Sequence, residues 1–265
     1  MRLSTVILII GLVTSFSVVA SISSNKHEQE KSKLAEIEAV ARAGNIDAQL
    51  FLAHAYLEGY EGISKNIPVG LDWLKMAAVD SKPEIQEYLG EIFHYGHYGD
   101  KDFEKAIFWY KKSAANNYAS AMDYVGLFYS GGLGGLKQDC GKAKLWYEKA
   151  NNAGYTQSKA NIVWILATCP DKKYRDGAKA ISMALEIISS KKEVTAGDLD
   201  NLAAAYAEQD NFEMAIKTQL EAIALLDPVK ESSRLKKHKL RLELYENRKK
   251  WRGSSNASPE DYGQE

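Results

Sequence analysis

Few residues in this 265-residue chain have the types and spacing that chemistry requires. His94, His97 and Asp100 could ligate a metal, but they lie in a stretch between predicted helices, and no third strong ligand sits on a fixed element. Ser-x-x-Lys, a serine-acylation pattern, occurs about as often as composition alone predicts, at Ser23, Ser189 and Ser233. The glycine cluster at 131–135 lacks the strand and the Lys-Ser/Thr pair of a phosphate loop. We therefore expect no enzyme, no metal site and no cofactor.

The elements that must position any site repeat every 36 to 37 residues. A block with a small residue, an aromatic three positions on and a glycine three later recurs at 52–59, 89–96 and 125–132. A second block places Trp73, Trp109 and Trp146 in one register. Within each block the apolar spacing is i, i+3, i+4 and i+7, which indicates one face of a helix. The sequence thus predicts an all-α fold of stacked antiparallel helix pairs.

The pattern A-x-x-x-L-G-x-x-Y-x-x-G followed by K-A-x-x-W-Y-x-K-A resembles the Sel1-like repeat, a relative of the tetratricopeptide repeat. It is carried here by Ala121–Gly132 and Lys142–Ala150, and by Tyr88–Phe93 with Lys105–Ser113. The resemblance implies a right-handed α-solenoid. A fourth unit is degenerate, because Val163 replaces the small residue.

The resulting division has six parts. We expect a signal peptide at 1–20, an N-terminal capping helix at 28–45, about four Sel1-like units at 46–190, a tetratricopeptide-like unit at 196–229, a basic C-terminal capping helix at 230–252 and a disordered tail at 253–265. The unit at 196–229 is assigned to the tetratricopeptide form, in which the connection between the two helices is shorter. Leu202 and Ala215 are only 13 residues apart, whereas the corresponding positions of the earlier units are 17 or 18 residues apart.

The first residues are typical of an export signal. Arg2 precedes an apolar run at 6–13, and small residues follow up to Ala20. The alternative is an uncleaved membrane anchor over residues 5–24. Export predicts a periplasmic protein, either free or membrane-anchored, in an oxidising compartment.

The two cysteines lie symmetrically about one predicted turn. The midpoint of Cys140 and Cys169 falls at Gly154-Tyr155, where the second helix of unit three turns into the first helix of unit four. Their sulfurs should therefore face each other at the open end of this helical hairpin, and an exported protein would join them as a disulfide. The alternative is two separately buried thiols.

Carrying over the family's groove positions predicts a partner-binding face on the first helix of each unit. Eight of 25 such positions are acidic and none is basic, which favours partners with basic segments. Several of these acids also fall in the first turn of a helix, where the helix dipole alone favours them. The groove candidates are His54, Glu58, Glu87, Glu91, Tyr95, Asp123, Leu127, Trp164, Asp200 and Glu208.

The charge is segregated, although the whole chain carries only −1. Residues 25–229 sum to −6 and residues 230–252 to +7. The basic segment is expected to cap the last unit with one face. The alternatives are contact with an anionic surface, or docking into the acidic groove of a second copy.

These features predict a non-enzymatic scaffold or adaptor of the bacterial cell envelope that binds a protein or peptide. Nucleic acid is not expected, because the chain as a whole is not basic. Two alternatives remain: a membrane-tethered assembly scaffold, and a penicillin-binding hydrolase of the kind linked to cysteine-rich Sel1-like proteins. Those proteins carry a Cys pair in each unit, whereas this chain has one pair in all.

Overall fold

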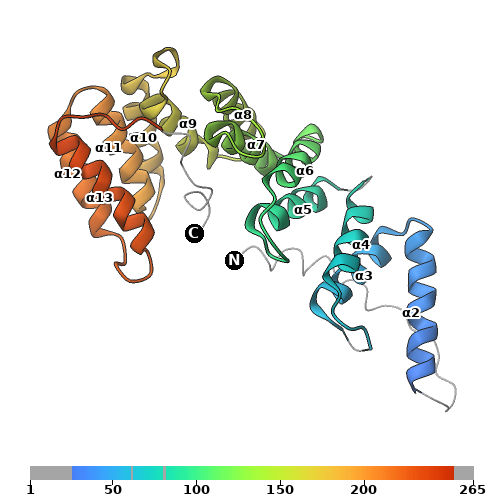
Figure 1. Cartoon of the computed structure of the whole chain (residues 1–265). Coiled ribbons are helices and arrows are strands. Elements are labelled where there is room, and N and C mark those ends of the chain that lie inside the picture. The colour runs from blue at the N-terminus through green and yellow to red at the C-terminus, as the bar shows by residue number, and fades with distance from the viewer. Residues whose placement is uncertain (1–25, 61, 80–81, 254–265) are drawn as a thin grey trace. The chain divides into compact units, whose positions relative to one another are not determined.

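A computed structural model describes residues 26–60, 62–79 and 82–253. The predicted signal peptide at 1–20 and residues 254–265 of the predicted tail lie outside this part. Within it the regular structure is helical, with twelve α-helices, one short 3₁₀ helix and no strand (Figure 1). Each of the helices α3 to α8, as well as α11 and α12, has 13 residues, which reflects the sequence period.

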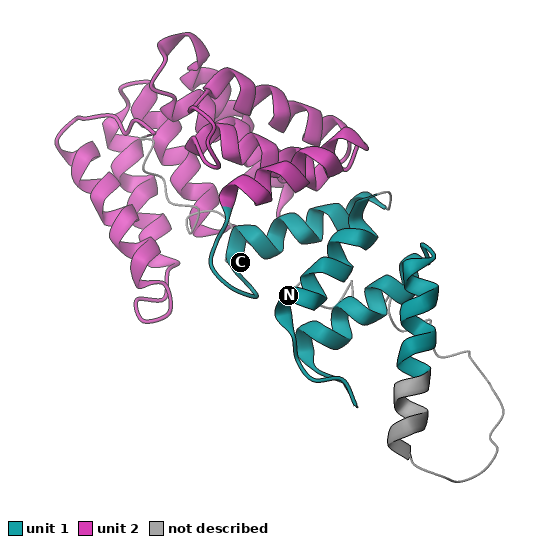
Figure 2. Ribbon diagram, turned by 45° about the vertical axis from the view of Figure 1, so that its right-hand side comes forward, with its two compact units in different colours: residues 1–102 teal, residues 103–265 magenta. Residues whose placement is uncertain are grey.

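The chain forms two compact units, divided after Asp102 (Figure 2). The first contains α2 (Lys26–Arg42), α3 (Ile46–Glu58), α4 (Ile67–Val79) and α5 (Pro83–Tyr95). Helix α3 packs against α4 and α2, and α4 also packs against α5. Gly70 on α4 makes the α3–α4 contact possible, since a Cβ there would lie 2.7 Å from Leu57 Cγ.

The second unit contains eight α-helices. They are α6 (Phe103–Ala115), α7 (Ala119–Gly131), α8 (Cys140–Asn152), α9 (Ser158–Thr168), α10 (Gly177–Ser190), α11 (Ala196–Glu208), α12 (Phe212–Ala224) and α13 (Ser232–Glu246), with the 3₁₀ helix at Lys172–Tyr174. Consecutive helices pack as pairs, and α9 and α11 also pack side by side. The unit thus stacks antiparallel helix pairs, as the sequence predicts.

Small residues control how closely the helices of a pair approach. A Cβ on Gly126 of α7 would lie 2.7 Å from the ring of Tyr147 on α8, so that aromatic fills the space a side chain would need. Val163 is fully buried, and α9 still packs against α10 because Ala180 and Ala184 supply the small side chains from the opposite helix. The α9–α10 pair therefore carries small side chains on the second of its two helices.

Helix ends follow local capping chemistry. Asn45, Asp139 and Asp176 each accept a hydrogen bond from the backbone N–H three residues on, at the starts of α3, α8 and α10. Thr195 and Asp198 form a reciprocal capping box at the start of α11. These caps fix where α3, α8, α10 and α11 begin.

The C-terminal helix is shorter than the sequence predicts. Helix α13 ends at Glu246 and not at 252, because Asn247 caps it and Arg248 adopts a left-handed backbone with φ of 53°. Gly253, assigned above to the disordered tail, donates its N–H to the carbonyl of Thr168 at 2.9 Å. Residues 248–253 are therefore an ordered, non-helical segment.

Cys140 and Cys169 meet at the open end of the α8–α9 hairpin. Cys140 begins α8 and Cys169 follows α9, their Cα atoms are 6.2 Å apart, and the structure joins the sulfurs as a disulfide. Both residues are buried in the core of the second unit. The bridge closes a loop of 29 residues around the turn at Gly154.

We predict that the Cys140→Ala/Cys169→Ala variant loses about 3 kcal/mol of unfolding free energy, because the unfolded chain regains the entropy of an open loop. Urea unfolding under oxidising conditions measures this. Reductant should shift the parent protein to the midpoint of the variant and leave the variant unchanged. Equal midpoints without reductant would contradict the prediction.

Candidate functional site

The predicted groove residues of the first unit differ in accessibility. His54 and Glu58 are exposed on α3, one turn apart. Glu91 and Tyr95 are half-buried on α5, whereas Glu87 is buried with 8% of its surface exposed. Burial leaves Glu87 little surface for a partner to meet, and its assignment to the groove stays a prediction.

A cluster of tyrosines surrounds Glu58. Tyr98, in the turn after α5, donates its hydroxyl to Glu58 Oε1 at 2.5 Å, and Tyr88 of α5 hydrogen-bonds to Tyr98. Burial, followed by the hydrogen bond to Glu58, raises the pKa of Tyr98, and burial raises that of Tyr88. Both phenols stay protonated, and Tyr98 donates to Glu58. We call His54, Glu58, Tyr88 and Tyr98 the Glu58 surface.

Sequence reasoning missed Tyr98 because it lies outside the helical register. The available signal was the aromatic content of 94–100, which the sequence interpretation weighed for metal binding. His94 in this stretch is fully buried and stacks on Tyr95 with ring centroids 4.5 Å apart. Among the described residues no three His, Cys, Asp or Glu side chains converge as a metal site requires.

In the second unit the predicted groove acids have partners within the chain. Asp123 of α7 accepts hydrogen bonds from Ser158 Oγ at 2.6 Å and Asn161 Nδ2 at 3.0 Å. Leu127 is buried with 4% exposed, and its assignment to the groove stays a prediction. Trp164 of α9 is half-buried beside an arginine of α13.

Asp200 of α11 forms a buried ion pair with Arg241 of α13. Arg241 Nε lies 2.7 Å from Asp200 Oδ1, with about a tenth of each side chain exposed. Gln219 Nε2 donates to the same oxygen at 2.9 Å, and His238 Nε2 lies 3.9 Å from it. Burial lowers the pKa of His238, which keeps this imidazole neutral beside Arg241.

Two tryptophans flank the guanidinium of Arg241. Its Cζ lies 5.5 Å from the ring centroid of Trp164 and 5.7 Å from that of Trp251, distances at which a cation is attracted to an aromatic ring. Arg241 therefore joins α9, α11 and the segment after α13 at one point.

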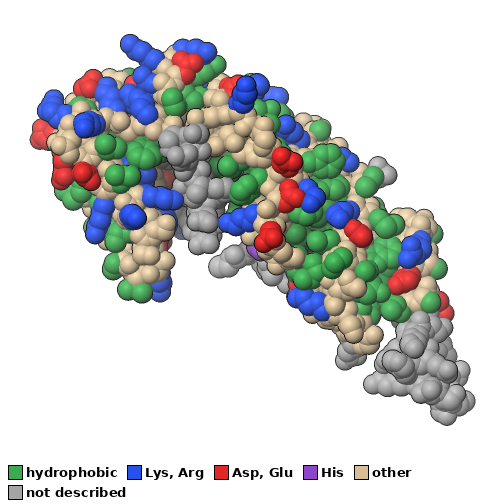
Figure 3. Space-filling view, viewed as in Figure 1, with side chains coloured by type: hydrophobic (Ala, Val, Ile, Leu, Met, Phe, Trp, Pro, Cys, Tyr) green, Lys and Arg blue, Asp and Glu red, His purple; other side chains and the backbone are tan. Residues whose placement is uncertain are grey.

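Glu208 at the end of α11 binds two arginines. Arg175 Nε lies 2.9 Å from one carboxylate oxygen and Arg252 2.8 Å from the other. Asp200 and Glu208 of α11 are thus paired with arginines of the chain's own basic C-terminal segment. Other Lys and Arg side chains lie exposed over the α10–α13 region (Figure 3).

The comparisons with known proteins agree with this architecture. The family model described as Sel1 repeat matches residues 46–78, 83–118 and 119–155. The chain contains three Sel1 repeats. These three matches comprise α3 to α8, so α9 to α13 and the Asp200–Arg241 pair lie after the matched Sel1 repeats.

Similar proteins come from several organisms. Chitin synthase regulatory factor 3 of Schizosaccharomyces pombe is 27% identical over 145 residues, 52% of this chain and 16% of that protein's length. A Sel1 repeat protein from Oxalobacter formigenes is 32% identical, with 49% of this chain and 96% of that chain covered and a TM-score of 0.41. A protective antigen of uropathogenic Escherichia coli with an SLR fold is 21% identical. The match covers 88% of this chain and 44% of that chain, with a TM-score of 0.44.

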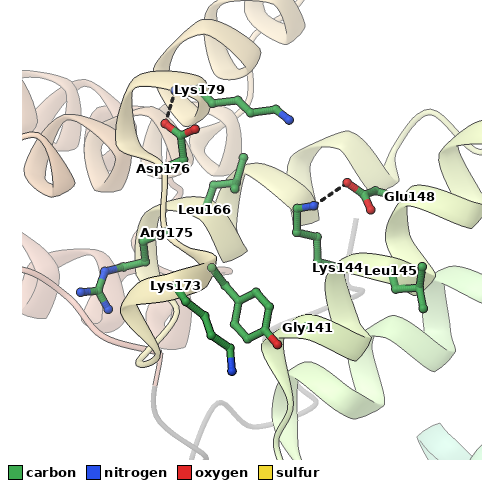
Figure 4. Close-up of a pocket in the computed structure, with 10 residues that line it drawn as sticks. Gly141, Lys144, Leu145, Glu148, Leu166, Lys173, Arg175, Asp176 and Lys179 are labelled. Carbon is green, nitrogen blue, oxygen red and sulfur yellow. Dashed lines mark hydrogen bonds and ion pairs between the residues drawn. The ribbon is translucent and has the colours of Figure 1, made fainter.

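At the end of the third Sel1 repeat, a surface hollow of about 480 Å³ lies between α8 and the start of α10 (Figure 4). Four cations line it, but Lys144 pairs with Glu148 at 2.7 Å, Lys173 pairs with Asp171 at 3.0 Å, and Arg175 points away toward Glu208. Asp176 is occupied in capping α10. These pairings leave the hollow without a converged set of reactive groups.

The serine patterns also occupy structural positions. Ser189 lies in the last turn of α10 and donates to the carbonyl of Glu186 at 2.9 Å, while Ser233 lies in the first turn of α13. Ser23 lies outside the described residues. The glycine cluster forms the end of α7 and the turn that follows it. In the described part of the chain, no helix has the length and apolarity needed to span a bilayer.

We predict that Arg241→Met lowers the free energy of unfolding by about 3–5 kcal/mol, because Asp200 is left charged and buried without its cation. Adding Asp200→Asn should recover part of this loss, which a double-mutant cycle by urea unfolding measures. Lys75→Met is the control, since it breaks the exposed Asp72 pair and should cost under about 1 kcal/mol. Equal losses of unfolding free energy in Arg241→Met and Lys75→Met would contradict the prediction.

We also predict that His94 makes the first unit sensitive to acid. Burial, aided by the charge of Lys101, lowers the pKa of His94 to about 4. Between about pH 6.5 and pH 4 the unfolded chain binds a proton that the folded chain does not, so stability falls as the pH falls, by about 3 kcal/mol in total.

Thermal unfolding at pH 6.5 and pH 5 tests this dependence. His94→Gln should make the change in melting temperature smaller, whereas His54→Gln, an exposed histidine of the same unit, should leave it as in the parent. An unchanged pH dependence in His94→Gln would show that another group is responsible.

Proposed function

We propose that this Sel1-repeat chain is a non-enzymatic scaffold that binds a protein or peptide partner through the first helices of its repeats. The observation that carries the proposal is the Glu58 surface. Its carboxylate accepts from a phenol, and within the described residues it has no ion-pair partner. A basic side chain of a partner is the group that would complement it.

The composition of this surface supports partner binding. Tyrosines combine apolar area with a hydrogen-bonding hydroxyl, which is why they are enriched in protein interfaces. Tyr88 and Tyr98 are half-buried and held by each other and by Glu58, so little side-chain entropy remains to be lost on binding. The partner we expect has a basic segment.

We place the scaffold in the bacterial envelope, in the periplasm or tethered to the membrane and facing it. The apolar run after Arg2 and the Cys140–Cys169 bridge support export to an oxidising compartment. Cell fractionation with amino-terminal sequencing separates a chain cleaved near Ala20 from one that keeps residues 5–24.

Crosslinking from the native envelope tests the binding proposal. We predict that Glu58→Lys lowers the amount of crosslinked partner at least tenfold relative to the parent chain, because like charges then meet at the interface. Asp72→Lys, at an exposed acid of α4, is the matched control and should keep the partner. Equal recovery with both variants would reject the Glu58 surface as the binding site.

A further inference from the structure

The chain does not end with α13 but crosses back over its own second unit. Lys249 donates its N–H to the carbonyl of Leu244 at 2.8 Å, which turns the backbone away from the helix axis. At the other end of the segment Gly253 donates its N–H to the carbonyl of Thr168, the last residue of α9 (Figure 1). We call residues 248–253 the strap.

Three side chains of the strap are held by separate chemistry. Lys250 Nζ lies 2.9 Å from the carbonyl oxygen of Glu208 and 2.9 Å from Asp210 Oδ1. Trp251 lies over the guanidinium of Arg241, and Arg252 binds the Glu208 carboxylate. The strap is thus recognised in the way that a bound peptide is recognised, by its backbone, an aromatic side chain and two cations.

The surface under the strap belongs to the repeat helices. Its acceptors are the Thr168 carbonyl at the C-terminus of α9 and the Glu208 carboxylate at the end of α11, and its platform is Arg241. Arg241 is fixed by Asp200 independently of the strap. The surface should therefore persist when the strap leaves.

The cationic side chains that hold the strap are more exposed than the Asp200–Arg241 ion pair. The side chain of Arg252 is 32% exposed and that of Lys250 25%, whereas Arg241 is 10% exposed. When the strap leaves, the Glu208 carboxylate keeps Arg175 as its partner, so it is not left as an unpaired buried charge. Displacing the strap therefore costs far less than undocking α13.

We propose that the Thr168–Glu208–Arg241 surface is a peptide-binding site that the strap occupies in cis. The partner it fits is an extended peptide with an aromatic residue followed directly by arginine. This proposal rests on the proposed function, partner binding by the repeat helices, and adds a second site with its own ligand chemistry. A competing peptide reproduces the contacts of Trp251 and Arg252 and releases the strap.

The test uses the full chain and a labelled peptide with the sequence of residues 247–253. Opening the site with Trp251→Ala/Arg252→Ser should tighten peptide binding at least tenfold over the parent, because the tethered competitor is removed. Adding Glu208→Gln should then weaken it at least tenfold, and adding Glu221→Gln, at an exposed acid of α12, should not. A peptide with Ala for Trp251 keeps its charge and should bind at least tenfold more weakly.

A second measurement needs no variant. Hydrogen exchange of the parent chain at saturating peptide should show faster exchange at 248–253 and unchanged exchange in α3. Equal affinity for the parent and the opened chain, or equal affinity for the Trp and Ala peptides, would overturn the proposal. A partner that still depends on Glu58 in that case would show that only the second site is wrong, and the proposed function would stand.

Discussion

The contact between Asp200 and Arg241 governs how the C-terminal half of the second unit is built. A charge taken out of water is costly unless a partner of opposite sign and well-placed hydrogen bonds replace the solvent. Asp200 therefore requires Arg241 at 2.7 Å and Gln219 at 2.9 Å, which ties α11 to α12 and α13 in one register. Sliding α13 by one residue would remove the cation and leave the acid buried.

The same pair extends its influence beyond the helices. Because Asp200 holds Arg241 in place, the guanidinium presents its faces to Trp164 on one element and Trp251 on another. Trp251 in turn brings Arg252 to Glu208. One buried polar contact thereby specifies the position of a segment with no regular structure of its own.

The sequence predicts the parts of this fold that depend on local pattern. The helix pairs follow from apolar spacing, whereas the ring that faces Gly126, Tyr147 of α8, is seen in the structure alone. The meeting of Cys140 and Cys169 follows from symmetry about a turn. In each case the residues that form the pattern lie within one repeat period, so the register of that repeat is enough to predict which residues meet.

Long-range pairings could not be predicted in the same way. Asp200 and Arg241 are 41 residues apart on helices that the repeat pattern does not relate, and the acid that the helix dipole explains, in the first turn of α11, is Asp198. The early end of α13 depends on Arg248 in a left-handed conformation, which no local signal at an arginine predicts. The course of the chain after the helix depends on tertiary contacts, of Arg252 with Glu208 and of Gly253 with Thr168.

The charge segregation of the sequence takes on a different meaning in the folded chain. The basic C-terminal segment is opposite in sign to the repeat body, and two of its arginines neutralise acids of α11 within the same chain. An outside cation must compete with a tethered one at Glu208, whereas at Glu58 the hydrogen-bond partner among the described residues is a neutral phenol. The electrostatic gain on binding therefore differs between the two units. A basic partner forms a new ion pair at Glu58, whereas at Glu208 it replaces an ion pair that the chain already makes.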